Sequence, residues 1–224
     1  MEIVFLLIVI ASATAGSAVM RARGQSLRWP LVTIGIAIVT FVLSVLALFD
    51  EGLLASLGRD RDALLAGEWW RIFTPLFAQD GGWPGLIFNI VALLVLGGFF
   101  EIALGGWMLV ITYFASGLLT EVVAYTLLPG QGFAGNSIAN FGLAGALAVI
   151  GLTVTSDLRV RVLAIVSLAA GAFLLVTLNL HGAGYTIGAL IGVGYVLVTR
   201  AKERPRMSAK SVAPGSPGES SAGS

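Results

Sequence analysis

The sequence contains no cysteine and a single histidine among its 224 residues. The absence of cysteine excludes disulfide bonds, thiol catalysis and cysteine-based zinc sites. The single histidine excludes a histidine-rich metal site. Charge is also scarce, since 11% of the residues are charged and the net charge is +1. A nucleic-acid-binding domain normally carries a basic patch. We therefore expect no nucleic-acid partner, no metal and no cofactor.

Apolar residues, by contrast, are abundant: 57% of the chain is hydrophobic and the mean hydropathy is +0.95. A soluble domain cannot hide that much apolar surface, so the composition predicts an all-α polytopic membrane protein in a lipid bilayer. Seven apolar stretches approach or reach the spanning length of about 20 residues. They lie near 3–20, 31–49, 85–103, 107–127, 136–154, 160–178 and 182–199.

The chain divides into three predicted parts. Residues 1–29 hold the first span and a basic loop, and residues 30–200 hold six spans with a long outer loop at 50–84. Residues 201–224 are rich in Pro, Gly and Ser and are predicted to be a disordered tail. The first span has an alternative interpretation, because ATAGSA resembles the cleavage site of a signal peptide. Against this, Glu2 rather than a basic residue precedes the stretch, and arginines follow it.

The basic residues predict the orientation of the chain. If seven spans alternate, three clusters of arginine and lysine share one side, which is then cytoplasmic. The carboxyl terminus is therefore expected in the cytoplasm, and the amino terminus and the 50–84 loop outside, in the plasma (inner) membrane of a bacterium. The clusters are Arg21, Arg23 and Arg28; Arg159 and Arg161; and Arg200, Lys202, Arg204, Arg206 and Lys210.

Ser137 and His181 each stand at the start of an apolar stretch. Taken alone, a helical serine usually bonds back to a carbonyl, and a lone histidine is usually a satisfied interior residue. Taken together, both lie about 27 Å from the opposite end of their spans, and hence at the same depth. Gly184 and Gly188 share a face with His181, and such small-residue faces let two helices approach closely. The imidazole would then reach the hydroxyl, as a serine nucleophile requires.

Several segments between residues 30 and 200 resemble, in order, motifs of the rhomboid family of intramembrane serine proteases. The segments are GEWWRIFTPLF, FNIVALLVLGGFFEIALGG, GNSIANFGLAGA and HGAGYTIG. The resemblance implies a six-helix rhomboid-like core plus one extra N-terminal transmembrane helix. It further implies an endopeptidase that cleaves transmembrane protein substrates near the outer face.

The resemblance also implies residue roles. Ser137 matches the nucleophile, His181 the general base, and Asn89 the side chain that binds the oxyanion together with the Ser137 backbone N–H. A further group is expected to support the structure, namely Gly135, Phe141, Trp70, Arg71, Glu101, Gly184 and Gly188. Two positions depart from the family pattern. Gly85 stands where the family has a histidine directed at the oxyanion, and Ile138 stands where it has a glycine.

These departures keep an alternative open. A rhomboid-like pseudoprotease, which binds membrane-protein clients without cleavage, accounts for Gly85 and Ile138 but explains less well why both Ser137 and His181 are present. A small transporter or channel would need a polar pathway, and the intramembrane charges are too few and too peripheral for one.

Overall fold

The computed structural model describes residues 1–128, 130–131 and 133–211, and every regular element in those ranges is helical. Seven of these helices are long and apolar enough to cross a membrane. The predicted all-α polytopic membrane fold is therefore confirmed, and the predicted spans agree with the helices within a few residues. The helices are α1 (Glu2–Ala22), α2 (Leu31–Phe49), α5 (Gly82–Leu104), α6 (Gly106–Thr126), α7 (Ser137–Val154), α8 (Leu158–Val176) and α9 (Leu180–Ser211).

Helix α9 extends beyond the predicted span, through Ser211. The assignment of residues 201–224 to a disordered tail stays a prediction. The rest of the predicted tail, 212–224, lies outside the described residues.

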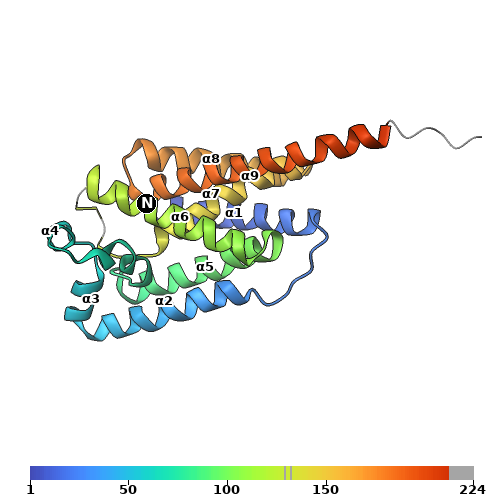
Figure 1. Ribbon diagram of the computed structural model, residues 1–224. Helices are drawn as coiled ribbons and strands as arrows, with labels where there is room; N and C mark the ends of the chain where they lie inside the picture. Colours follow the sequence, from blue (N-terminus) through green and yellow to red (C-terminus); the bar gives the residue numbers. More distant parts are fainter. Residues whose placement is uncertain (129, 132, 212–224) are drawn as a thin grey trace, which may run out of the picture.

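The spanning helices run side by side, with α7 in the middle of the bundle (Figure 1). Helix α7 packs against α1, α5, α6, α8 and α9, and most of its residues are buried. Its alanines and glycines allow this close approach from every side. The amino terminus and the 50–81 loop lie at one end of the bundle, and the linker between α1 and α2 lies at the other (Figure 1).

Helix α1 is packed into the bundle between α5, α7 and α8. Ser12 Oγ lies 2.8 Å from Ser167 Oγ of α8, which in turn lies 2.8 Å from the hydroxyl of Tyr185 on α9. A Cβ atom at Gly16 would come within 2.9 Å of the Phe99 Cβ on α5. These contacts fix the middle and the inner part of α1 against its neighbours.

The outer loop contains two short α-helices, α3 (Glu51–Leu57) and α4 (Arg61–Leu65), and two 3-10 helices, η1 (Trp69–Ile72) and η2 (Thr74–Phe77). Arg71 is buried at its centre. Its guanidinium donates to the carbonyls of Ala55 at 2.7 Å and Gly58 at 2.8 Å, and to the Glu68 carboxylate at 2.7 Å. Trp70 is partly exposed, and its indole N–H lies 3.4 Å from the Ser56 carbonyl.

Two buried carboxylates join distant parts of the chain. Glu101, near the end of α5, accepts the backbone N–H groups of Val32 at 3.1 Å and Thr33 at 2.8 Å. It therefore satisfies the start of α2, where a negative charge also interacts favourably with the helix dipole. Glu121 of α6 binds Arg59 of the outer loop through two hydrogen bonds, of 2.5 and 2.9 Å.

Candidate active site

Ser137 is the first residue of α7, and His181 is the second residue of α9. The two helix starts lie at the same depth, as the sequence predicts. His181 Nε2 is 2.9 Å from Ser137 Oγ, which is a hydrogen-bond distance. The structure thus brings the hydroxyl and the imidazole into direct contact.

This contact depends on glycines where α7 and α9 meet. A Cβ atom at Gly184 would collide with the Ile138 carbonyl, and one at Gly188 would collide with the Gly142 carbonyl. On the facing helix, a Cβ atom at Gly145 would collide with the Tyr185 carbonyl. The two backbones therefore touch, and the Ser–His separation is set by the main chain.

The imidazole is oriented by Asn179, which immediately precedes α9. Asn179 Oδ1 accepts the His181 backbone N–H at 2.9 Å and lies 2.7 Å from His181 Nδ1. Because the backbone N–H must donate, the amide oxygen is fixed at this position, and Nδ1 donates to it as well. Nε2 then carries the lone pair that faces Ser137. Asn179 is one of the polar residues inside the apolar stretches of the sequence, and such residues are functional candidates by default.

Two aromatic rings enclose the imidazole. The Phe141 ring, expected to pack beneath His181, lies 5.0 Å from it at an interplanar angle of 65°. The Phe5 ring of α1 lies closer, at 4.5 Å. Nothing in the sequence around Phe5 predicts this contact, because it arises from the placement of α1 in the bundle.

Side-chain amides form a buried network beside Ser137. The amide nitrogen of Asn89 donates to Gln79 Oε1 at 2.7 Å, and that of Gln79 donates to Asn136 Oδ1 at 2.6 Å. The NH₂ group of Asn89 has two N–H bonds, and Gln79 takes one of them. The second N–H is available to another acceptor. The sequence suggests Gln79 as a further oxyanion donor, but in the structure its amide nitrogen donates to Asn136.

The segment leading to Ser137 is held by its backbone. Asp80 Oδ2 accepts the N–H groups of Phe133 at 2.7 Å and Ala134 at 3.1 Å. The N–H of Gly135 donates to the Pro75 carbonyl at 2.8 Å. A Cβ atom at Gly135 would lie 3.3 Å from Gln79 Oε1 and 3.4 Å from Ser137 Oγ, so this glycine borders both groups.

The two departures from the family pattern have different surroundings. Ile138 is buried and packs in a cluster with Leu76, Ala124 and Leu180, so its side chain contributes to the core. A Cβ atom at Gly85 would meet nothing within 4 Å, so the missing histidine leaves open space.

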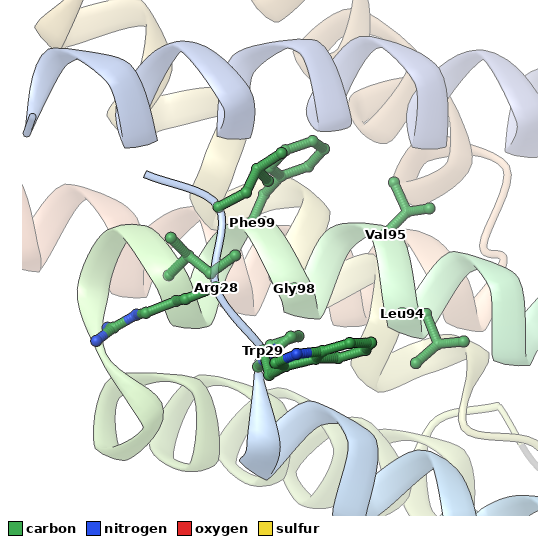
Figure 2. A pocket seen from close by; sticks show the side chains of 9 residues that line it. Arg28, Trp29, Leu94, Val95, Gly98 and Phe99 are labelled. Atoms are coloured by element: carbon green, nitrogen blue, oxygen red, sulfur yellow. The ribbon is translucent and has the colours of Figure 1, made fainter. Parts of the chain in front are cut away.

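Ser137, His181 and Asn89 line a cavity of about 410 Å³, which Gly85 also borders. A cavity of about 550 Å³ lies at the other end of α5, beside the α1–α2 linker. Its walls are mostly apolar, and the Arg28 guanidinium points away from Leu94 and Val95 (Figure 2). This second cavity has no nucleophile and no base in its lining. The Ser137 cavity is the candidate active site, because a hydroxyl, an oriented imidazole and amide donors are the groups required for attack on a carbonyl.

Trp70, Arg71 and Glu101 do not line this cavity. Their contacts lie in the outer loop and at the opposite end of the bundle. The supporting roles expected for them stay a prediction.

The chain is similar to known proteins. Residues 66–202 match the Rhomboid domain. The chain is also 32% identical over 146 residues to the rhomboid protease GluP of Bacillus subtilis (strain 168). That similarity covers 62% of this chain and 28% of the length of the relative. With the Rhomboid domain matching more than half of its residues, the chain belongs to the rhomboid family.

Proposed function

We propose that the protein is an intramembrane serine endopeptidase that cleaves transmembrane proteins with the Ser137–His181 pair. The observation that carries this proposal is the 2.9 Å contact between His181 Nε2 and Ser137 Oγ, together with the hydrogen bond by which Asn179 orients the imidazole. Ser137 begins α7, so no carbonyl four residues earlier in the same helix competes for its hydroxyl.

In the proposed reaction, Ser137 Oγ attacks the carbonyl carbon of the scissile peptide bond, and its proton passes to His181 Nε2. The resulting imidazolium is stabilised by Asn179 Oδ1, which accepts from Nδ1. The carbonyl oxygen becomes an oxyanion. His181 then gives the proton to the leaving amine, which breaks the peptide bond and leaves an ester on Ser137. Water, with His181 again as base, hydrolyses that ester and restores the hydroxyl.

Two donors are proposed for the oxyanion. The first is the Ser137 backbone N–H, which has no acceptor within α7 because it stands in the first turn. The second is the N–H of Asn89 that Gln79 does not use. Gln79 holds the Asn89 amide plane, and this fixed orientation takes over part of the task of the histidine that is absent at position 85.

The proposed substrates are transmembrane helices that unwind near the outer face of a bacterial plasma membrane. Ser137 and His181 both lie at the end of the bundle that carries the 50–81 loop. Water and substrate would therefore reach them from that side. Helices with glycine or other poor helix formers near their outer ends unwind at the lowest cost.

The proposal is tested with purified protein in liposomes and a transmembrane substrate. Ser137→Ala and His181→Ala should each reduce cleavage by about 10³-fold or more, and the double variant should lose little more, since the pair acts as a unit. A fluorophosphonate probe should label the wild type at Ser137 and spare the alanine variant. Binding of a transmembrane helix with neither cleavage nor labelling would instead establish the pseudoprotease alternative.

A further inference from the structure

The cavity of about 550 Å³ at the far end of α5 from Ser137 has no part in the proposed reaction. We call it the inner cavity. Its floor is a face of α5 from Leu94 to Ile102, and residues 27–30 of the α1–α2 linker border it (Figure 2). Leu94 and Ile102 are eight residues apart, so the floor is about 12 Å long. The inner cavity therefore runs from the middle of α5 nearly to its end.

The inner cavity arises from the way three helices pack. Among the helices that the structure describes, α1 and α2 both pack against α5 but are not extensively packed on each other. A face of α5 between them is thus left uncovered. Leu94 on this face is exposed, and so are Leu27 and Trp29 of the linker. Exposed apolar side chains of a membrane protein face lipid, so an acyl chain can enter the inner cavity and restore the contacts that an empty space would lose.

Arg28 gives the inner cavity a positive charge. Its side chain is exposed, and its guanidinium points away from Leu94 and Val95 (Figure 2). Within the part of the chain that the structure describes, Arg28 has no acidic partner. The carboxylate of Glu101, on the same helix as Leu94, is occupied because it accepts N–H groups at the start of α2. A free guanidinium beside an apolar cavity complements a phosphate attached to an acyl chain.

The surroundings of Arg28 favour a lipid with a net negative charge. Arg21 stands in the last turn of α1, and Arg23 follows that helix. Basic residues at the cytoplasmic end of a spanning helix attract anionic lipids, and the positive-inside rule places this end in the cytoplasm. The Trp29 indole extends from the linker toward Leu94 (Figure 2), and tryptophan is typical of the boundary between headgroups and hydrocarbon.

We propose that the inner cavity is a binding site for an anionic phospholipid of the cytoplasmic leaflet. Its phosphate lies on Arg28, and one acyl chain lies along α5 between Leu94 and Ile102. The volume is within the range of about 300–1,000 Å³ that is usual for ligand sites. The bound lipid joins the α1–α2 linker to α5, where α1 and α2 do not meet. This inference is independent of the proposed protease activity, because none of the groups at Ser137 takes part in it.

The first test uses Trp29 as a fluorescent probe. A variant keeps Trp29 and has phenylalanine in place of the other tryptophans. It is placed in phosphatidylcholine vesicles that contain either phosphatidylglycerol or phosphatidylcholine with brominated acyl chains, which quench a nearby indole. Half-maximal quenching should need about fivefold less of the brominated phosphatidylglycerol. The matched control keeps Trp107 alone, which is exposed at the start of α6 and does not line the inner cavity. The two brominated lipids should quench Trp107 about equally.

The second test changes the two ends of the inner cavity in the variant that keeps Trp29. Arg28→Gln should abolish the preference for phosphatidylglycerol, while both brominated lipids still quench. Val95→Phe should fill the apolar part and weaken quenching by both lipids. Its matched control is Val91→Phe, one turn earlier on α5, where the side chain is exposed and lies outside the inner cavity. Val91→Phe should behave like the unsubstituted probe.

Several outcomes overturn the site. Equal quenching of Trp29 by the two lipids, or the same preference at Trp29 and Trp107, shows only general contact with the membrane. An unchanged preference in Arg28→Gln removes the phosphate contact, and unchanged quenching in Val95→Phe removes the acyl chain. A Trp29 that neither lipid quenches shows that protein, such as a second copy of this chain, fills the inner cavity.

A second measurement needs no tryptophan replacement, in case those variants do not fold. Wild type and Arg28→Gln are delipidated in detergent, mixed with equal amounts of phosphatidylglycerol and phosphatidylcholine, and examined by native mass spectrometry. The wild type should retain phosphatidylglycerol over phosphatidylcholine by about fivefold, and Arg28→Gln should retain the two equally. Equal retention of the two lipids by the wild type overturns the proposal.

Discussion

At the scale of single residues, the candidate site depends on how one imidazole is oriented. The Asn179 oxygen receives both the backbone N–H and the Nδ1–H of His181. The backbone donor prevents the amide from presenting its nitrogen, so the tautomer with a lone pair on Nε2 is favoured. Asn179 is thus proposed as a positioning residue that acts through His181.

Replacement of this residue tests the assignment. Asn179→Ala should lower kcat by about 10–100-fold, the loss usual when a group that orients a functional histidine is removed. KM for a transmembrane substrate should change less than kcat, because Asn179 acts through the orientation of His181. Asn179→Asp retains an oxygen acceptor and should recover most of the rate. Equal losses in the alanine and aspartate variants would contradict the positioning role, and the measurement is kcat and KM in liposomes.

At the scale of elements, the contact between α7 and α9 determines whether the Ser137 hydroxyl and the His181 imidazole meet. Gly188 lies against the Gly142 carbonyl, whereas Gly194, one turn and a half further along α9, has nothing within 4 Å of its Cβ position. Gly188 and Gly194 therefore provide a test position and its control on the same helix.

Gly188→Ala should force α7 and α9 apart. This overpacking should lower the free energy of unfolding by about 1–3 kcal/mol. It should also reduce cleavage by about 10²-fold, because His181 is displaced from Ser137. Gly194→Ala should leave cleavage near the wild-type value, because its Cβ position is open, and should keep the free energy of unfolding or raise it by up to about 1 kcal/mol, because alanine favours a helix over glycine. Thermal unfolding in detergent and cleavage in liposomes measure the two effects. Equal behaviour of the two variants would argue against a main-chain origin of the Ser–His distance.

The outer loop is a second element, and its contribution to stability can be measured separately from catalysis. Removing the Arg71 guanidinium leaves the buried carbonyls of Ala55 and Gly58 without their donor, which should cost about 2 kcal/mol of stability. Arg71→Ala is therefore expected to unfold at lower temperature, while the fraction that remains folded still takes the fluorophosphonate probe. If Arg71→Ala unfolds at the wild-type temperature but has lost turnover, Arg71 takes part in the reaction instead.

At the scale of the whole molecule, the arginine and lysine distribution predicts which side each end occupies. The amino terminus and the 50–81 loop share one end of the bundle, and the positive-inside rule places that end outside. Reporter fusions at Ser224 and within the 50–84 loop should consequently report opposite compartments, with Ser224 cytoplasmic. Both reporters on one side would rule out seven alternating spans.

Much of the fold and of the candidate site can be predicted from the sequence, because the length of the apolar stretches and the spacing of the glycines can be read directly along the chain. The spans and the proximity of Ser137 to His181 follow from them directly. The position of Phe5 beside the imidazole does not, since it depends on where α1 docks among helices distant in sequence. The link from Asn89 to Gln79 is likewise a tertiary contact.

The backbone contact between α7 and α9 also matters in bilayers of different thickness. A span that does not match the hydrocarbon layer around it tilts. Helices whose main chains touch along a row of glycines must tilt as one body, so the hydroxyl and the imidazole keep their separation. What changes is the depth of the pair below the headgroups. Lipid thickness would thus regulate how easily water and an unwound segment arrive, while the proton transfer itself stays the same.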